Sequence, residues 1–206
     1  VHPGCSPDEV LDIGFGLNAL LADRNDTVHL LGRTLLNEPY YQRRDADGSW
    51  RWAEVISQIP PSIVTALADD AGRLSFVWAD YPDSPLHPLH FFRQRRSDGT
   101  WGATEALGAS GHPNLVLDDQ GRIHMMYTDR AVFHLGEYVL FYRSRTPNGV
   151  WSDPEAVATI EDQRLDATLA LLGDGAAYLF WVDRGIDGSA RTSIRYRVRQ
   201  PNGGWS

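Results

Sequence analysis

One seven-residue phrase, Arg-x-x-Asp/Asn-Gly-x-Trp, constrains the fold of this chain more than any other feature of its sequence. It occurs four times in 206 residues, at 44–50, 95–101, 145–151 and 199–205. Its tryptophans are therefore separated by 51, 50 and 54 residues. Self-similarity at a fixed period of this length is typical of an array of stacked structural units.

Each phrase predicts the tip of a β-hairpin, because Asp-Gly and Asn-Gly supply the positive φ that a tight turn requires. With a two-residue turn, side chains alternate across the hairpin. Each phrase tryptophan then shares a face with the aromatic residue nine positions upstream. We expect these aromatic pairs, repeated in every unit, to bury the sheets on one another. The pairs are Tyr41/Trp50, Phe92/Trp101, Tyr142/Trp151 and Tyr196/Trp205.

Four short apolar or aromatic stretches separated by turns recur in each unit, without helical periodicity. Four strands per roughly 50 residues is the pattern of a β-propeller blade. We expect an all-β fold: a single β-propeller domain, 1–206, with four visible four-stranded blades. The expected blades are 14–56, 57–107, 108–157 and 158–206, with 1–13 as a closing or end strand.

Two arrangements of the blades stay open. The fourth unit stops after its tryptophan, at Ser206, and residues 6–11 resemble 152–157, the fourth strand of the third unit. Joining the two ends would complete a blade and close a four-bladed ring without an open sheet edge. Alternatively, the four units belong to a larger propeller.

Composition excludes several functions. The formal net charge of -8 argues against general nucleic-acid binding, which needs a basic surface. It also argues against binding to anionic membranes. A single cysteine, Cys5, rules out an internal disulfide. The sequence contains no Gly-x-Ser-x-Gly elbow and no His-Glu-x-x-His motif.

The phrase continues as Asp-Gly-x-Trp-x-x-x-Glu, as in 47–54 and 98–105. This pattern, with an apolar strand ending in Trp-x-Asp, resembles the bacterial neuraminidase repeat of sialidase-like propellers and repeats of some propeller lectins. The resemblance implies a propeller and, among its activities, glycoside hydrolysis or glycan binding. The sialidase box has two residues between Gly and Trp, whereas all four copies here have one. The sialidase Arg-Ile-Pro signature is absent, and the nearest string is Gly121-Arg122-Ile123-His124, so no catalytic residue is transferred.

The loops that vary most between units follow the second strand of each blade or join two blades, and they are expected on one face, opposite the Trp hairpins. That face is the predicted ligand site. Three aspartates at equivalent positions there could bind sugar hydroxyls or a channel cation. Alternatively, each accepts backbone N–H bonds and fixes its own loop. The candidate ligand-binding residues are Asp80, Asp129, Asp183, Tyr81, His112, Arg130 and Arg184.

Other side chains have simpler interpretations. His87, His90, His112 and His134 are expected to be solvated loop residues, and no metal site is assigned. Trp78, Tyr127 and Trp181 are expected to pack between blades. The arginine pairs 93/95, 143/145 and 197/199 are expected on a solvated rim. Pairing with Glu54, Glu105 and Glu155 would require a bulge, because simple alternation places the two sets on opposite faces.

We therefore expect a non-catalytic binding or assembly module that recognises a protein or a glycan through its loop face. A sialidase-like hydrolase and a carbohydrate-binding lectin are the alternatives. No cofactor is expected; a cation in the central channel is the alternative. The expected partner is a protein or a glycan, and neither nucleic-acid binding nor direct membrane insertion is expected. The chain is expected to be part of a secreted or cell-envelope protein, or of a larger complex.

Overall fold

The computed structural model describes residues 17–34, 38–56, 64–80, 89–108, 111, 113–130, 138–160, 167–183 and 193–206. In these residues the fold is all-β. Fifteen strands form four antiparallel sheets, each built from consecutive strands. The prediction of an all-β fold with one sheet per repeat is confirmed. No helix of the described residues is long and apolar enough to span a membrane.

The first three sheets have four strands in the order in which they occur in the chain, and the fourth sheet has three in its described part. Sheet one comprises β1 (Leu17–Ala22), β2 (Val28–Arg33), β3 (Pro39–Arg44) and β4 (Glu54–Val55). Sheet two comprises β5 (Val64–Ala68), β6 (Leu74–Asp80), β7 (Leu89–Arg95) and β8 (Glu105–Ala106). Sheet three comprises β9 (Asn114–Leu117), β10 (Ile123–Arg130), β11 (Tyr138–Arg145) and β12 (Glu155–Ile160). Sheet four comprises β13 (Ala167–Leu171), β14 (Ala177–Asp183) and β15 (Ser193–Arg199).

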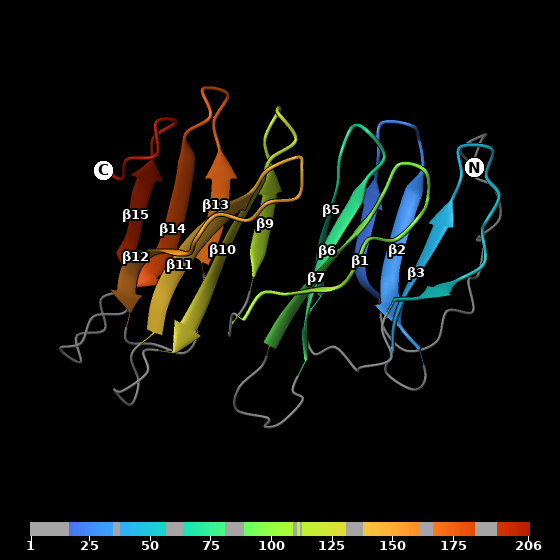
Figure 1. The fold of residues 1–206 in the computed structure, drawn as a ribbon, viewed down its shortest axis with the longest axis horizontal. Helices are drawn as coiled ribbons and strands as arrows, with labels where there is room; N and C mark the ends of the chain where they lie inside the picture. The colour runs from blue at the N-terminus through green and yellow to red at the C-terminus, as the bar shows by residue number, and fades with distance from the viewer. Residues whose placement is uncertain are drawn as a thin grey trace, which may run out of the picture.

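The four sheets stand side by side in chain order, with the first and fourth at opposite ends of the molecule (Figure 1). Their first strands contact one another in series, β1 with β5, β5 with β9 and β9 with β13. This is an open array: the described sheets do not close into a ring. The predicted closing strand, 1–13, lies outside the described residues.

The Trp hairpin has a different turn from the one predicted. Arg95 and Trp101 form an isolated bridge, Arg96 N–H donates to the Thr100 carbonyl, and Gly99 N–H donates to the Arg96 carbonyl. Gly99 has a φ of 86°, which only glycine adopts without strain. This turn has three residues instead of the predicted two. A shift of one residue moves a side chain to the other face of a strand. The tryptophan therefore does not face its own unit's aromatic residue.

Instead, each tryptophan contacts the preceding sheet. We call the face of a sheet toward the next unit its front face and the opposite one its rear face. The Trp101 ring meets the Tyr41 ring edge-on at 5.6 Å, and Trp151 meets Phe92 in the same way at 5.3 Å. The Tyr142–Trp205 pair repeats this geometry at 5.5 Å. The predicted partners were wrong by one unit, although the prediction that aromatic pairs bury the sheets on one another holds.

A glutamate and an arginine complete each of these contacts. Glu105, on β8, accepts hydrogen bonds from Trp151 Nε1 at 3.0 Å and Arg145 Nη2 at 2.8 Å. The Arg145 guanidinium also lies over the Phe92 ring, 4.6 Å from its centre. We call this set of aromatic ring, glutamate, arginine and tryptophan the clasp. It recurs with Tyr41, Glu54, Arg95 and Trp101, and with Tyr142, Glu155, Arg199 and Trp205.

The clasp corrects the prediction of a solvated arginine rim. Arg95 and Arg145 are each only 7% exposed, since they lie between two sheets. Glu105 lies opposite Phe92 and therefore belongs to the front face, whereas the arginines belong to the rear face, as simple alternation predicts. The pairing therefore forms between units rather than within one.

Apolar residues from neighbouring sheets fill the space between the first strands and the clasps. Front-face Leu31 of sheet one packs with rear-face Phe76 and Trp78 of sheet two in one buried cluster. Equivalent clusters join sheets two and three, and sheets three and four. Trp78, Tyr127 and Trp181 are all buried in these clusters, which confirms their predicted packing role.

Candidate functional site

The three predicted aspartates occupy equivalent positions in successive sheets. Asp80 ends β6 opposite Leu89, and Asp183 ends β14 opposite Ser193. Asp129 lies near the end of β10, opposite Val139. These strands end at one edge of the array (Figure 1). The Trp hairpins, and the turns that join the first and second strands of each sheet, lie at the opposite edge, as predicted (Figure 1).

The rest of the predicted loop site is not described. Tyr81, His112 and Arg184 lie outside the described residues. So do the side chains of Asp80, Asp183 and Arg130. Asp129 is half-buried. The structure therefore places the backbone of the aspartates on one edge, and the ligand role of these seven residues stays a prediction.

The histidines follow a different pattern from the one predicted. His90 is fully buried, so it is not a solvated loop residue, whereas His87, His112 and His134 lie outside the described residues. Among the described side chains, no three His, Cys, Asp or Glu residues lie close enough to hold a metal ion.

Two buried Asp-His-Tyr triplets are each connected by hydrogen bonds through their side chains. His124 Nδ1 lies 2.7 Å from the Tyr142 hydroxyl, and its Nε2 lies 3.2 Å from Asp118 Oδ2. His29 makes the same contacts, with Tyr41 at 2.9 Å and Asp23 at 3.3 Å. Burial raises the pKa of Tyr41 to about 12. A nucleophilic tyrosine needs an accessible hydroxyl with a lowered pKa, so these triplets are structural.

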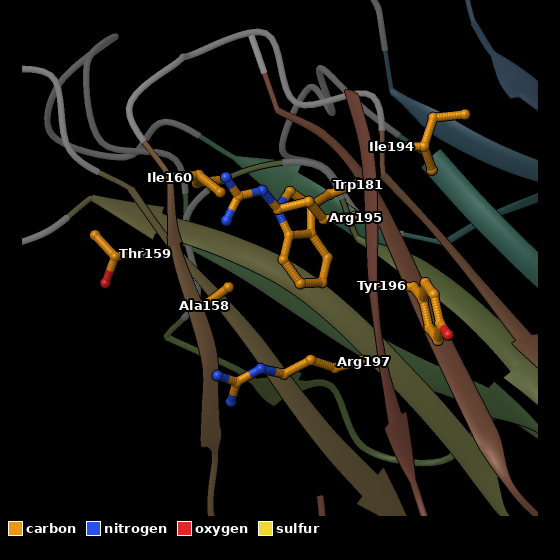
Figure 2. A pocket seen from close by; sticks show the side chains of 8 residues that line it. All are labelled: Ala158, Thr159, Ile160, Trp181, Ile194, Arg195, Tyr196 and Arg197. Carbon is orange, nitrogen blue, oxygen red and sulfur yellow. The ribbon is translucent and has the colours of Figure 1, made fainter. Parts of the chain in front are cut away.

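A groove with polar chemistry lies between the third and fourth sheets. Its volume is about 470 Å³. One wall is the end of β12, and the other is the middle of β15 with one residue of β14 (Figure 2). The lining residues are Ala158, Thr159, Ile160, Trp181, Ile194, Arg195, Tyr196 and Arg197.

Two arginines give the groove its charge. Arg195 and Arg197 alternate on β15, so both belong to the rear face, and both side chains are exposed. Their guanidinium groups extend from β15 toward β12, and the Trp181 ring lies beside Arg195 (Figure 2). Trp181 pairs with Arg195 across the strands and is 6% exposed, so it forms the floor of the groove.

The groove exists because the fourth sheet departs from the repeat. The strand register makes Arg195 equivalent to Tyr40, Phe91 and Phe141. Phe91 stacks on Trp78 at 5.6 Å, and Phe141 stacks on Tyr127 at 5.5 Å. In the second and third sheets an apolar ring therefore occupies the position at which the fourth sheet has the polar Arg195.

The second groove arginine also differs from its equivalents. Arg93 donates hydrogen bonds to the Gly102 and Ile56 carbonyls, and Arg143 lies 4.6 Å from the centre of the Trp151 ring. Arg197, at the same register, is exposed toward the groove. In addition, β12 is six residues long where β4 and β8 have two, which builds the facing wall.

This arrangement can bind an anion next to an apolar surface. Guanidinium groups donate paired hydrogen bonds to carboxylate, sulfate or phosphate oxygens, and such charge-assisted bonds are the strong ones. The groove has no acidic side chain among its lining residues, although the whole chain carries a net charge of -8. Thr159 adds one hydroxyl for neutral hydrogen bonding.

Comparison with protein-family models gives no match, and no curated protein matches the sequence. Solved structures do resemble the fold. An α-L-arabinofuranosidase of Fusarium graminearum aligns with 69% of this chain and 46% of its own, at a TM-score of 0.55 and 14% identity.

Two further structures match over most of the chain. A polysaccharide lyase of family PL25, an ulvan lyase bound to -[GlcA(1-4)Rha3S]-, aligns with 94% of this chain and 56% of its own, with a TM-score of 0.60 and 16% identity. The lectin of Aleuria aurantia, in complex with Fucα1-6GlcNAc, aligns with 91% and 60%, with a TM-score of 0.52 and 12% identity.

The chain thus spans about half the length of the arabinofuranosidase and of the ulvan lyase. At these identities the likeness is one of fold, and the chain shares its array of antiparallel sheets with carbohydrate-active proteins.

Proposed function

We propose that this chain is a non-catalytic carbohydrate-recognition module that binds anionic sugars in the groove between β12 and β15. Its sheets act as the blades of a propeller-like scaffold, which is the arrangement predicted from the repeat. A scaffold of repeated sheets provides rigid walls, and the residues that break the repeat provide the specificity.

The observation that carries the proposal is the arginine at position 195. A repeated sheet that only needed packing would keep an aromatic ring here, as the other three do. An arginine exposed beside Arg197 introduces a second positive charge instead. Two guanidinium groups near an indole and a hydroxyl suit a sugar that carries a carboxylate or sulfate.

The structural neighbours support a carbohydrate ligand. They include a lyase bound to a saccharide of GlcA and Rha3S, and a lectin bound to Fucα1-6GlcNAc. The first of these ligands is anionic, which agrees with the chemistry of the groove. A carbohydrate ligand also fits the predicted secreted or cell-envelope location.

Hydrolysis of sialosides is the alternative function. It requires an accessible nucleophile, and the two tyrosines that hydrogen-bond to a histidine, Tyr41 and Tyr142, are fully buried. A fluorogenic sialoside assay separates the two functions: we expect no turnover, and turnover that survives purification would favour the hydrolase.

A glycan array tests the ligand class. We expect retention of uronate-containing or sulfated glycans over neutral glycans of the same backbone. Binding should weaken at high salt, because exposed charges are screened. Loss of one charge-assisted hydrogen bond costs about 1.5–3 kcal/mol, so Arg197→Ala should lower affinity roughly ten- to hundredfold.

Arg96→Ala is the matched control, since it removes one exposed arginine from a Trp hairpin outside the groove. Equal retention of neutral and anionic glycans would contradict the proposal. An array without hits would favour a protein partner.

A further inference from the structure

The front face of the fourth sheet lacks the cover that the other three front faces have. Tyr41, Phe92 and Tyr142 are at most 1% exposed, because the clasp of the following sheet lies on them. Tyr196, at the equivalent position in β15, is 60% exposed.

The uncovered surface extends beyond one side chain. Ile194, on the same face of β15, is 73% exposed. On β14, the Tyr178 ring stacks on Tyr196 with ring centres 6.3 Å apart, and the Phe180 ring is tilted against Tyr196 with ring centres 5.7 Å apart. We call these four residues the terminal aromatic face. A contiguous aromatic surface of this kind on a folded protein marks an interaction site.

The rear face of the first sheet is only partly open. Leu30 and Tyr40 belong to it by register and are 4% exposed, whereas Leu20 and Val55 on the same face are 59% and 52% exposed. A second copy that docked this face head-to-tail would bring aliphatic side chains, and the test below separates that occupant from a further sheet. The described part of the array thus ends in one open aromatic face, on the fourth sheet.

We propose that the terminal aromatic face docks a further sheet of the same repeat, which lays the tryptophan and arginine of an Arg-x-x-Asp/Asn-Gly-x-Trp hairpin on Tyr196. The interface is the continuation of three that already exist. Each existing one sets an indole edge-on to the front-face ring at 5.3–5.6 Å and a guanidinium 4.6–5.1 Å above it. The ring of Tyr196 presents the same chemistry at the same register.

The test is an extended chain that supplies this sheet. Trp205-Ser206 repeats Trp151-Ser152, so residues 153–206 can be appended after Ser206 without a break in the repeat. The appended segment brings a copy of Glu155 beside β15, and a hairpin for docking. The appended copy of Tyr196 is changed to Phe so that the two peptides differ in mass.

The readout is hydroxyl-radical labelling of Tyr196, measured by mass spectrometry. In the original chain we expect strong labelling of Tyr196 and little of Tyr142, which is the internal control. In the extended chain, labelling of Tyr196 should fall at least fivefold. Replacing the appended hairpin tryptophan by alanine should restore much of it.

The other outcomes count against the proposal. Unchanged labelling of Tyr196 in a folded extended chain would overturn it, and so would failure of that chain to fold, since its junction reproduces an existing one. If the original chain is dimeric and Tyr196→Arg makes it monomeric, a second copy occupies the face instead. Binding of sugars by this face in the array, abolished by Tyr196→Arg, would equally contradict it.

Discussion

Removal of Glu105 should destabilise the molecule by breaking the clasp between the second and third sheets. This carboxylate accepts hydrogen bonds from Arg145 and Trp151. Its side chain is 35% exposed, and that of Arg145 is 8% exposed. In Glu105→Ala the guanidinium stays between two sheets without its carboxylate, and the indole N–H loses its acceptor.

The size of the effect follows from this burial. Breaking a fully buried ion pair by removing one partner costs about 3–5 kcal/mol. Water reaches Glu105 and reduces that cost, so we expect Glu105→Ala to lower the free energy of unfolding by about 2–3 kcal/mol. Glu105→Gln keeps one acceptor and should cost about 1 kcal/mol.

Urea unfolding followed by tryptophan fluorescence measures these changes. Asp153→Ala removes an exposed carboxylate two residues after Trp151; it is the control and should change stability by less than about 0.5 kcal/mol. A double-mutant cycle with Arg145→Met should show coupling. If Glu105→Ala were as neutral as Asp153→Ala, the clasp would not hold the sheets together.

Three further predictions follow from single positions. Gly149→Ala should cost more than about 1 kcal/mol in urea unfolding, because φ there is 90° and a Cβ would lie 3.0 Å from Arg145 Nη2; an unchanged midpoint would mean that the turn adapts. Burial lowers the pKa of His124 below 6.5. As the pH falls, His124 therefore binds a proton in the unfolded chain at a higher pH than in the folded chain. Stability should then fall as pH decreases below 6.5, and His124→Gln should flatten that slope in unfolding midpoints measured from pH 7.5 to 5. Trp52 is 94% exposed, so Trp52→Ser should leave the thermal midpoint unchanged, whereas a marked loss would reveal a contact with residues outside the described ranges.

Much of the fold could be predicted from the sequence because one phrase repeats at the same place in every unit. Asp-Gly and Asn-Gly fix hairpins, and apolar stretches between them fix strands. The pairing of Trp101 with Tyr41 could not be predicted in this way. It depends on one extra turn residue, which moves Trp101 to the rear face of its sheet while Glu105 still lies opposite Phe92.

The groove was missed for a related reason. The sequence analysis weighed residues that recur, such as Asp80, Asp129 and Asp183, and treated Arg197 as part of a rim. The useful signal was a residue that does not recur. Alignment of the third strands shows Arg195 in place of Tyr40, Phe91 and Phe141, but only the register assigns it to the rear face and to the wall opposite β12.

The most direct test of the proposed function is a calorimetric titration of Arg195→Phe with a sulfated or uronate-containing oligosaccharide. This substitution introduces the phenylalanine that the second and third sheets carry at this position, so it should preserve the thermal midpoint. We expect it to lower affinity at least tenfold relative to the original chain, while Arg96→Ala binds normally. Unchanged affinity in a folded Arg195→Phe protein would contradict the assignment of the groove as the sugar site.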